Sequence, residues 1–154
     1  PYQGRFLGTS VNDKEAVLRA FSLTKANRLK DKKFAILSGG EKQKIVIARA
    51  VAQTTPWMLL DEPIASLDIK NQIEIMQTLL ELNRQEGVSV LMVLHDINLA
   101  GIYCDRLIML KDGQVIAAGN TNECLCEENL KKLYDISFFH MDTKKGQRYY
   151  YAEI

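Results

Sequence analysis

Two short apolar runs with a helical stretch between them constrain the fold of this chain most strongly. Residues 57–60 and 88–94 are apolar at almost every position, which is typical of strands buried on both faces of a parallel sheet. An amphipathic helix is predicted between them, with Gly87 placed to end it. Its apolar positions are Ile69, Ile73, Met76 and Leu80. Strand, helix and strand predict a right-handed βαβ unit in an α/β fold.

Three polar residues follow these two predicted strands. Asp61 and Glu62 come directly after the first strand, and His95 comes directly after the second. Ligands of open α/β sheets collect beyond the carboxyl ends of the strands. An acid after a strand can also cap the next helix, and a single histidine can be structural. Their coincidence at one sheet edge favours a functional site.

A Ser-Gly-Gly-Glu segment opens another predicted helix, which should end near residues 53–56. Ser38 and Glu41 have the spacing of a capping box, which by itself indicates an ordinary helix start. However, glycine in a first turn is unfavourable by up to about 1 kcal/mol relative to alanine. The adjacent Gly39 and Gly40 therefore indicate that something approaches the backbone closely. A helix N-terminus of this kind is a candidate phosphate contact.

The remaining elements are predicted from local patterns. They are a helix capped by Asn12 and Glu15 with Val17, Ala20, Phe21 and Thr24 on one face, a short helix capped by Asp96, a hairpin over 106–118 that turns at Asp112-Gly113, helical segments over 121–134, and a closing hairpin of 138–142 and 148–152. The tyrosines 149–151 fit an alternating strand, and stacking on a base is a second interpretation.

Composition excludes several classes of protein. The 154 residues are typical of one domain, and 20 basic against 19 acidic residues give a net charge of +1. That balance carries no global signal for nucleic acid or anionic lipid. Three cysteines without metal-ligand spacing indicate a reducing compartment, and no apolar run approaches the roughly 18 residues of a membrane span. The chain is expected to be cytoplasmic.

The order of these motifs resembles the ATP-binding cassette (ABC) ATPases, the motor subunits of ABC transporters. The matching parts are the signature Leu37-Ser38-Gly39-Gly40-Glu41, the strand ending at Asp61-Glu62, the turn Ser66-Leu67-Asp68 and the strand ending at His95. The resemblance implies a partial P-loop NTPase (RecA-like) parallel sheet with a helical signature subdomain and C-terminal β-hairpins. The implied division is 1–55 for the signature subdomain, 56–120 for the core, and 121–154 for the C-terminal helix and hairpin.

The resemblance also implies a role for each site residue. Residues 38–41 would contact the γ-phosphate of ATP held by the opposite subunit of a dimer. Asp61 would help to hold Mg²⁺ through water, and Glu62 would polarise the attacking water. Asp68 would belong to the D-loop, which communicates across the dimer, and His95 would sense the γ-phosphate. ATP and Mg²⁺ are the cofactors so implied.

Several family features are absent or changed. Glu41 stands where glutamine is commoner, and Ile64 stands where threonine is frequent. The Walker A pattern G-x-x-x-x-G-K-S/T, the Q-loop glutamine and the adenine-stacking aromatic do not occur. The chain is thus either the C-terminal part of a longer ATPase, which its start at Pro1 favours, or a complete protein without catalytic competence. Loss of the Walker A strand predicts an uncovered strand edge or hydrophobic face, and self-association or local disorder there.

Smaller patterns over 94–100, 103–106, 111–113 and 118–119 resemble ATPases that serve importers of iron chelates, haem and vitamin B12. The implied partners are a second ATPase subunit in a homodimer, a membrane permease and, indirectly, a substrate-binding protein, at the cytoplasmic side of the membrane. Nucleic acid is not an expected partner. An amino-acid importer, a soluble ABC ATPase of DNA repair or ribosomes, and a non-catalytic interaction module are the alternatives.

Overall fold

The computed structural model describes residues 11–144 and 146–153. It contains two compact units, residues 1–94 and 95–154, each with buried apolar residues of its own. Residues Pro1-Tyr2-Gln3-Gly4, which resemble the segment after the Q-loop in ATPases of iron-chelate, haem and vitamin B12 importers, lie outside the described residues. The sequence-based division at residues 55 and 120 follows family subdomains and stays a prediction.

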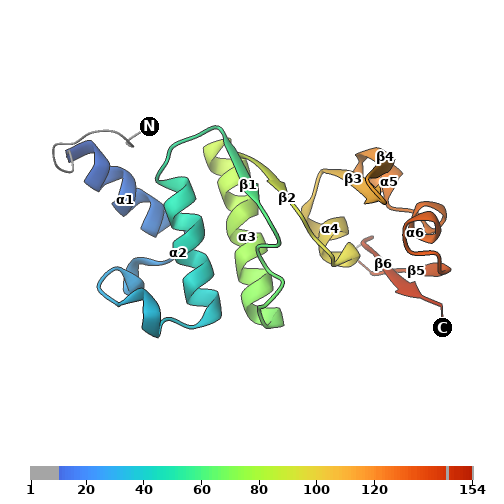
Figure 1. The fold of residues 1–154 in the computed structure, drawn as a ribbon, viewed down its shortest axis with the longest axis horizontal. Helices are drawn as coiled ribbons and strands as arrows, with labels where there is room; N and C mark the ends of the chain where they lie inside the picture. The colour runs from blue at the N-terminus through green and yellow to red at the C-terminus, as the bar shows by residue number, and fades with distance from the viewer. Residues whose placement is uncertain (1–10, 145, 154) are drawn as a thin grey trace. The chain divides into compact units, whose positions relative to one another are not determined.

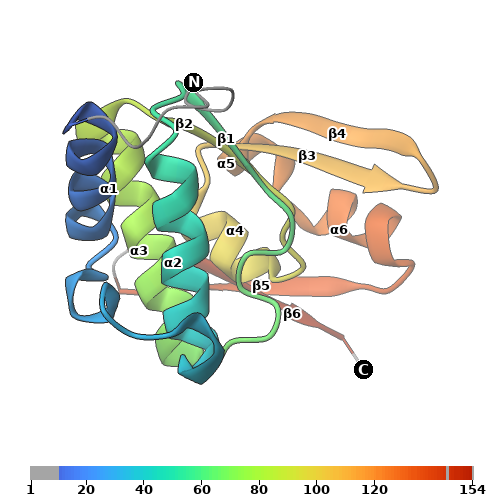
Figure 2. The same cartoon turned by 60° about the vertical axis from the view of Figure 1, so that its left-hand side comes forward.

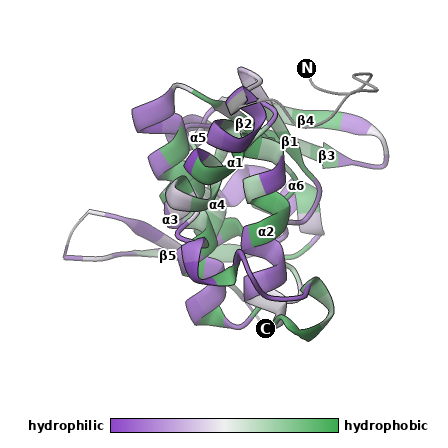
Figure 3. Ribbon diagram, turned by 90° about the vertical axis from the view of Figure 1, so that its left-hand side faces the viewer, coloured by the Kyte–Doolittle hydropathy of each residue, from purple (hydrophilic) through white to green (hydrophobic). Residues whose placement is uncertain are grey.

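The described part of the first unit, residues 11–94, consists of helices and a pair of strands (Figure 1). They are α1 (Val11–Leu23), α2 (Gly39–Val51), β1 (Trp57–Leu60), α3 (Ile69–Glu86) and β2 (Ser89–Met92), with single 3₁₀ turns η1 (Asn27–Leu29) and η2 (Phe34–Ile36) before α2. Helices α2 and α3 run side by side in Figures 1 and 2. Figure 3 shows hydrophobic residues through the middle of α2, where Ile47 and Ala48 are buried.

The predicted βαβ unit is confirmed. Strand β1 pairs in parallel with β2, from Trp57 opposite Ser89 to Leu60 opposite Met92, and α3 connects them. Gly87 ends α3 with φ 68°, a left-handed conformation that glycine adopts without a Cβ penalty. Asp61 therefore follows the carboxyl end of a parallel strand, as predicted.

The prediction that residues 57–60 and 88–94 are buried on both faces is wrong. Met58 is only 5% exposed, whereas Trp57 is 61% and Leu59 73% exposed. On the neighbouring strand, Leu91 is 52% exposed. Successive side chains of a strand point to opposite faces, so one face of β1 is covered and the other is open. This open apolar face agrees with the predicted hydrophobic surface.

The predicted buried face of α3 is also wrong in part. Ile69 is 75% exposed and Ile73 is exposed, whereas Met76 of the same predicted stripe is buried, as is Ile75 outside it. Asn71 and Glu74 both contact α2, at Gly40 and Lys44. At 3.6 residues per turn these positions lie on the opposite side of α3 from Ile69 and Ile73. The spacing identified an apolar stripe, but the neighbouring helix covers the other side.

The predicted cap of the first helix is corrected as well. Helix α1 begins at Val11, so Asn12 lies within its first turn rather than before it. The preceding position lies outside the described part of the chain. On the predicted face, Ala20 and Thr24 are buried, but Val17 is 45% exposed.

The second unit consists of two hairpins with short helices around them. Its elements are α4 (Ile97–Tyr103), β3 (Arg106–Lys111), β4 (Gln114–Asn120), α5 (Thr121–Cys124), α6 (Glu127–Tyr134), β5 (Phe138–Asp142) and β6 (Arg148–Ala152). Both hairpins are antiparallel, and Asp112 and Gly113 turn the first with φ 49° and 75°. The two hairpins, the two helical segments and the Asp96 cap of α4 are all confirmed.

The core of this unit explains the tyrosine run. Its buried residues are Met109, Cys124, Leu125, Leu130 and Tyr150. The Tyr150 hydroxyl donates to the carbonyl oxygen of Leu125, while Tyr151 is exposed and stacks on Phe139 with ring centroids 5.4 Å apart. Strand alternation therefore accounts for the pattern.

None of the helices in residues 11–144 and 146–153 could cross a membrane, because none is both long and apolar enough.

Candidate functional site

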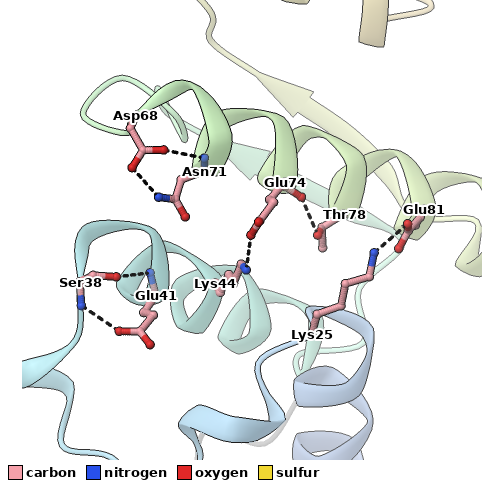
Figure 4. A network of polar contacts seen from close by, with 9 residues as sticks. All are labelled: Lys25, Ser38, Glu41, Lys44, Asp68, Asn71, Glu74, Thr78 and Glu81. Atoms are coloured by element: carbon pink, nitrogen blue, oxygen red, sulfur yellow. Dashed lines mark hydrogen bonds and ion pairs between the residues drawn. The ribbon is translucent and has the colours of Figure 1, made fainter.

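The Ser-Gly-Gly-Glu segment forms the predicted capping box at the start of α2 (Figure 4). The Glu41 N–H donates to Ser38 Oγ at 3.3 Å, and the Ser38 N–H donates to Glu41 Oε2 at 3.0 Å. The first bond satisfies one backbone N–H of the first turn, that of Glu41. The second fixes the backbone of Ser38, where the chain enters the helix. The remaining N–H groups, with the helix dipole, favour an anion at this end of α2.

Glu41 is held in its charged form by two donors. The hydrogen bond from the Ser38 N–H lowers the pKa of Glu41, and Lys32, whose Nζ lies 3.2 Å from Oε1, lowers it further. A carboxyl whose pKa is depressed by folding stabilises the folded state above its unfolded pKa. That contribution is lost as the pH falls through the folded pKa.

We expect Glu41→Gln to change the thermal midpoint at pH 7 by less than about 3 °C, because glutamine completes the same box. Thermal unfolding measured from pH 7 to pH 3 should then show a smaller acid-induced fall for Glu41→Gln than for the natural chain. Equal falls in the two proteins would contradict the role of the Glu41 charge.

The two glycines of this segment have different surroundings. A Cβ on Gly40 would lie 2.2 Å from Asn71 Oδ1, which no side chain tolerates without displacement. A Cβ on Gly39 would meet only Leu67 Cδ2, at an ordinary 3.6 Å. The predicted close approach to the backbone thus comes, at Gly40, from a side chain of α3. Gly39 is exposed and leaves room for another molecule.

Asp68 begins α3 beside this segment. Its Oδ1 accepts from the Asn71 N–H at 2.9 Å, and its Oδ2 accepts from Asn71 Nδ2 at 2.7 Å. Hydrogen bonds from Asn71 lower the pKa of Asp68, so its carboxylate is charged over the neutral range. The structure places Asp68 and Gly40 against the same asparagine. Sequence reasoning missed Asn71, because its link to Gly40 has no local pattern.

Asp61 and Glu62 are both exposed immediately after β1. Glu62 has φ 44°, a left-handed conformation that costs about 1–3 kcal/mol in a residue other than glycine. Its carbonyl oxygen accepts from the Ala65 N–H at 3.3 Å, within the turn that leads to α3. Pro63 and Ile64 are buried beneath this turn. The buried base of the turn thus supports a strained acidic residue, a combination frequent at functional sites.

A magnesium ion fits one exposed carboxylate of this kind. Mg²⁺ usually keeps several waters and takes one or two protein carboxylates together with substrate phosphates. Asp61 presents such a carboxylate. The described residues contain no group of three or more His, Cys, Asp or Glu side chains arranged to hold a metal by themselves. A single carboxylate acting with phosphate therefore suits these residues better than a closed metal cage.

His95 is the first residue of the second unit and is exposed. Asp96 after it caps α4, accepting from the N–H groups of Asn98 and Leu99 at 2.9 Å each. The capping fixes the backbone directly after His95. That His95 lies close to Asp61 and Glu62 stays a prediction.

Comparison with known proteins identifies the family. The family model described as ABC transporter matches residues 7–65. The ferric enterobactin transport ATP-binding protein FepC of Escherichia coli (strain K12) is 39% identical over 142 residues, which are 92% of this chain and 52% of FepC. The chain belongs to the ABC transporter ATPase family. It spans about half the length of the curated relatives that it matches.

Solved ABC structures share the fold of this chain. An ABC transporter in an inward-facing conformation matches it with a TM-score of 0.91 and 26% identity, over 97% of this chain and 61% of the other. The ATP-binding cassette MJ0796, solved as a dimer with ADP and Pi, matches with a TM-score of 0.62 and 36% identity, over 75% and 50%. The predicted α/β cassette fold is therefore confirmed.

Proposed function

We propose that this chain belongs to the ATP-hydrolysing subunit of an ABC importer for an iron chelate or a related metal-containing nutrient. The observation that carries the proposal is the exposed Asp61-Glu62 pair at the carboxyl end of a parallel strand. The capped N-terminus of α2, where Gly39 is exposed, supplies donors for phosphate. The name of FepC, a ferric enterobactin transport protein, supports the class of nutrient.

Hydrolysis of ATP transfers a phosphoryl group to water. Glu62 would orient that water and accept its proton, and Asp61 would hold Mg²⁺. The ion, when bound, neutralises charge that develops on the phosphate oxygens. The backbone N–H groups at Gly39 and Gly40, with the Ser38 hydroxyl, would donate hydrogen bonds to the γ-phosphate.

The proposed hydrolysis needs a second subunit. Residues 38–41 and Asp68 would act on ATP held by a second copy of the protein, and His95 would sense the γ-phosphate on its own copy. The dimeric state of MJ0796 supports this arrangement. A membrane permease and a substrate-binding protein would select the nutrient, with this subunit peripheral at the cytoplasmic face.

A calorimetric titration with Mg-ATP tests the proposal. We expect the 154-residue chain alone to bind at least about a hundredfold more weakly than a form of the protein that includes a Walker A segment, because that loop cradles the phosphates. Equal binding by the two forms would mean that the phosphates are held by groups of this chain other than those proposed. No binding by either form would contradict the ATPase assignment.

A further inference from the structure

Helices α2 and α3 are joined near their N-termini by two different contacts, one turn apart. The first is the packing of the Asn71 side chain against Gly40. The second is the ion pair between Lys44 Nζ and Glu74 Oε2, 2.6 Å apart, in which the Lys44 side chain is only 11% exposed. Figure 4 shows this pair farther along both helices than Ser38 and Asp68, which cap their N-termini. The two helix starts are thus held together.

The Asn71 side chain has a fixed orientation. Its Nδ2 donates to Asp68 Oδ2 at 2.7 Å, while its own backbone N–H donates to Asp68 Oδ1 at 2.9 Å. With the amide nitrogen committed to Asp68, the amide oxygen lies over Gly40. A side chain at residue 40 could enter only if Asn71 rotated away and gave up its bond to Asp68.

We propose that Asn71 is a positioning residue that locks the signature segment, residues 38–41, to the turn that ends at Asp68. The two segments then move as one body. Residues 38–41 and Asp68 therefore keep a fixed position relative to each other when they reach the nucleotide of the opposite subunit. This inference rests on the proposed function. It also assigns the two glycines different tasks, since Gly40 makes room for Asn71 and Gly39 leaves its outer face open to nucleotide.

The alternative is that residue 40 is glycine so that the nucleotide, and not the Asn71 side chain, can approach the backbone closely. Burial separates the two explanations, because Gly40 is buried and Gly39 is exposed. Gly40→Ala would clash with Asn71 Oδ1 at 2.2 Å and Cγ at 2.5 Å. In an Asn71→Ala background only the Cβ of residue 71 remains, at 3.1 Å. The effect of Gly40→Ala should therefore depend on residue 71.

A double-mutant cycle in urea unfolding tests this contact. Gly40→Ala should destabilise the natural protein, because it breaks the Asn71 to Asp68 bond. In the Asn71→Ala background the same change should be neutral or stabilising, by up to about fivefold in the unfolding constant, since alanine favours helix. Equal destabilisation by Gly40→Ala in both backgrounds would overturn the proposal. The change Gly39→Ala, whose Cβ would make only an ordinary contact with Leu67, should show no coupling to Asn71.

Steady-state kinetics test the positioning role in a form of the protein that includes a Walker A segment. Asn71→Ala should lower kcat for ATP hydrolysis about tenfold or more, since misplacement by about 1 Å costs up to 10²-fold. Its KM should change by less than about threefold, because Asn71 is not placed to touch the nucleotide.

The matched control is Asn83→Ala. It removes a similar bond at the other end of α3, from Asn83 Nδ2 to the Val88 carbonyl oxygen at 3.0 Å. Its kcat should stay within about twofold of the natural protein. Equal kcat values for Asn71→Ala and Asn83→Ala would overturn the positioning role. If the unmutated protein does not hydrolyse ATP, the proposed function fails, while the unfolding cycle still decides whether Asn71 and Gly40 are coupled.

Discussion

Glu62→Gln should reduce ATP hydrolysis by at least about a hundredfold in a form of the protein that includes a Walker A segment. An amide has the size of the carboxylate but cannot accept a proton from water, and general base catalysis contributes roughly 10²–10⁴-fold. Glutamine adopts the left-handed backbone of residue 62 at the same cost as glutamate, so the turn after β1 should persist. Phosphate release measures the loss, and calorimetry should show that Mg-ATP still binds.

The control for this variant is Glu81→Gln. Glu81 is a half-buried residue of the first unit whose carboxylate still reaches solvent, and its Oε1 lies 2.9 Å from Lys25 Nζ. Its neutralisation should leave hydrolysis within about twofold, because an exposed ion pair contributes at most about 1 kcal/mol to stability. Hydrolysis that persists in Glu62→Gln would contradict Glu62 as the base. A non-catalytic interaction module would show no hydrolysis with either Glu62 or Gln at this position.

Local signals in the sequence predicted most element boundaries. Gly87 stops α3 because it adopts φ 68°, and the Asp112-Gly113 pair turns a hairpin because both residues adopt positive φ. Asp96 caps α4 with its own carboxylate, which accepts two N–H bonds. Each of these features depends on residues within a few positions of one another, so a single sequence suffices to find it.

Burial could not be predicted in the same way. The apolar residues Trp57 and Leu59 suggested a strand covered on both sides, yet both are exposed. Whether such a face is covered depends on the segments that pack against it. FepC and the achromobactin transport ATP-binding protein CbrD are about twice as long as this chain, so they contain further segments that could cover such a face. Likewise, Asn71 has no sequence signature, because its contact with Gly40 arises only when two helices distant along the chain pack together.

The candidate site divides in the same manner. The capping box of Ser38 and Glu41 and the place of Asp61 at a strand end follow from local pattern, and the structure confirms both. The meeting of His95 with these residues depends on the arrangement of two units and of a second copy. It stays a prediction, as do the catalytic roles that the family resemblance implies.

Leu130→Ala should lower the free energy of unfolding of the second unit by about 2–5 kcal/mol. Leu130 is fully buried in the cluster with Met109, Leu125 and Tyr150, so α6 and the two hairpins all lose contacts when its side chain is removed. Part of the loss is the transfer free energy of the deleted atoms, and the rest is the cavity that rigid neighbours cannot fill. Urea unfolding of the full chain, followed by the fluorescence of its tyrosines, measures the change.

Leu110→Ala separates burial from the chemistry of leucine. Leu110 lies on β3 and is 61% exposed, so its truncation removes little buried surface and should cost less than about 0.5 kcal/mol. Both variants delete the same atoms, and a difference of several kcal/mol between them reports the surroundings of the two side chains, because the helix and strand propensities of alanine differ from those of leucine by about 1 kcal/mol or less. If Leu130→Ala cost no more than Leu110→Ala, the cluster around Leu130 would not be the core of this unit. A large difference would show that the cluster around Leu130 is the core that holds α6 against the two hairpins.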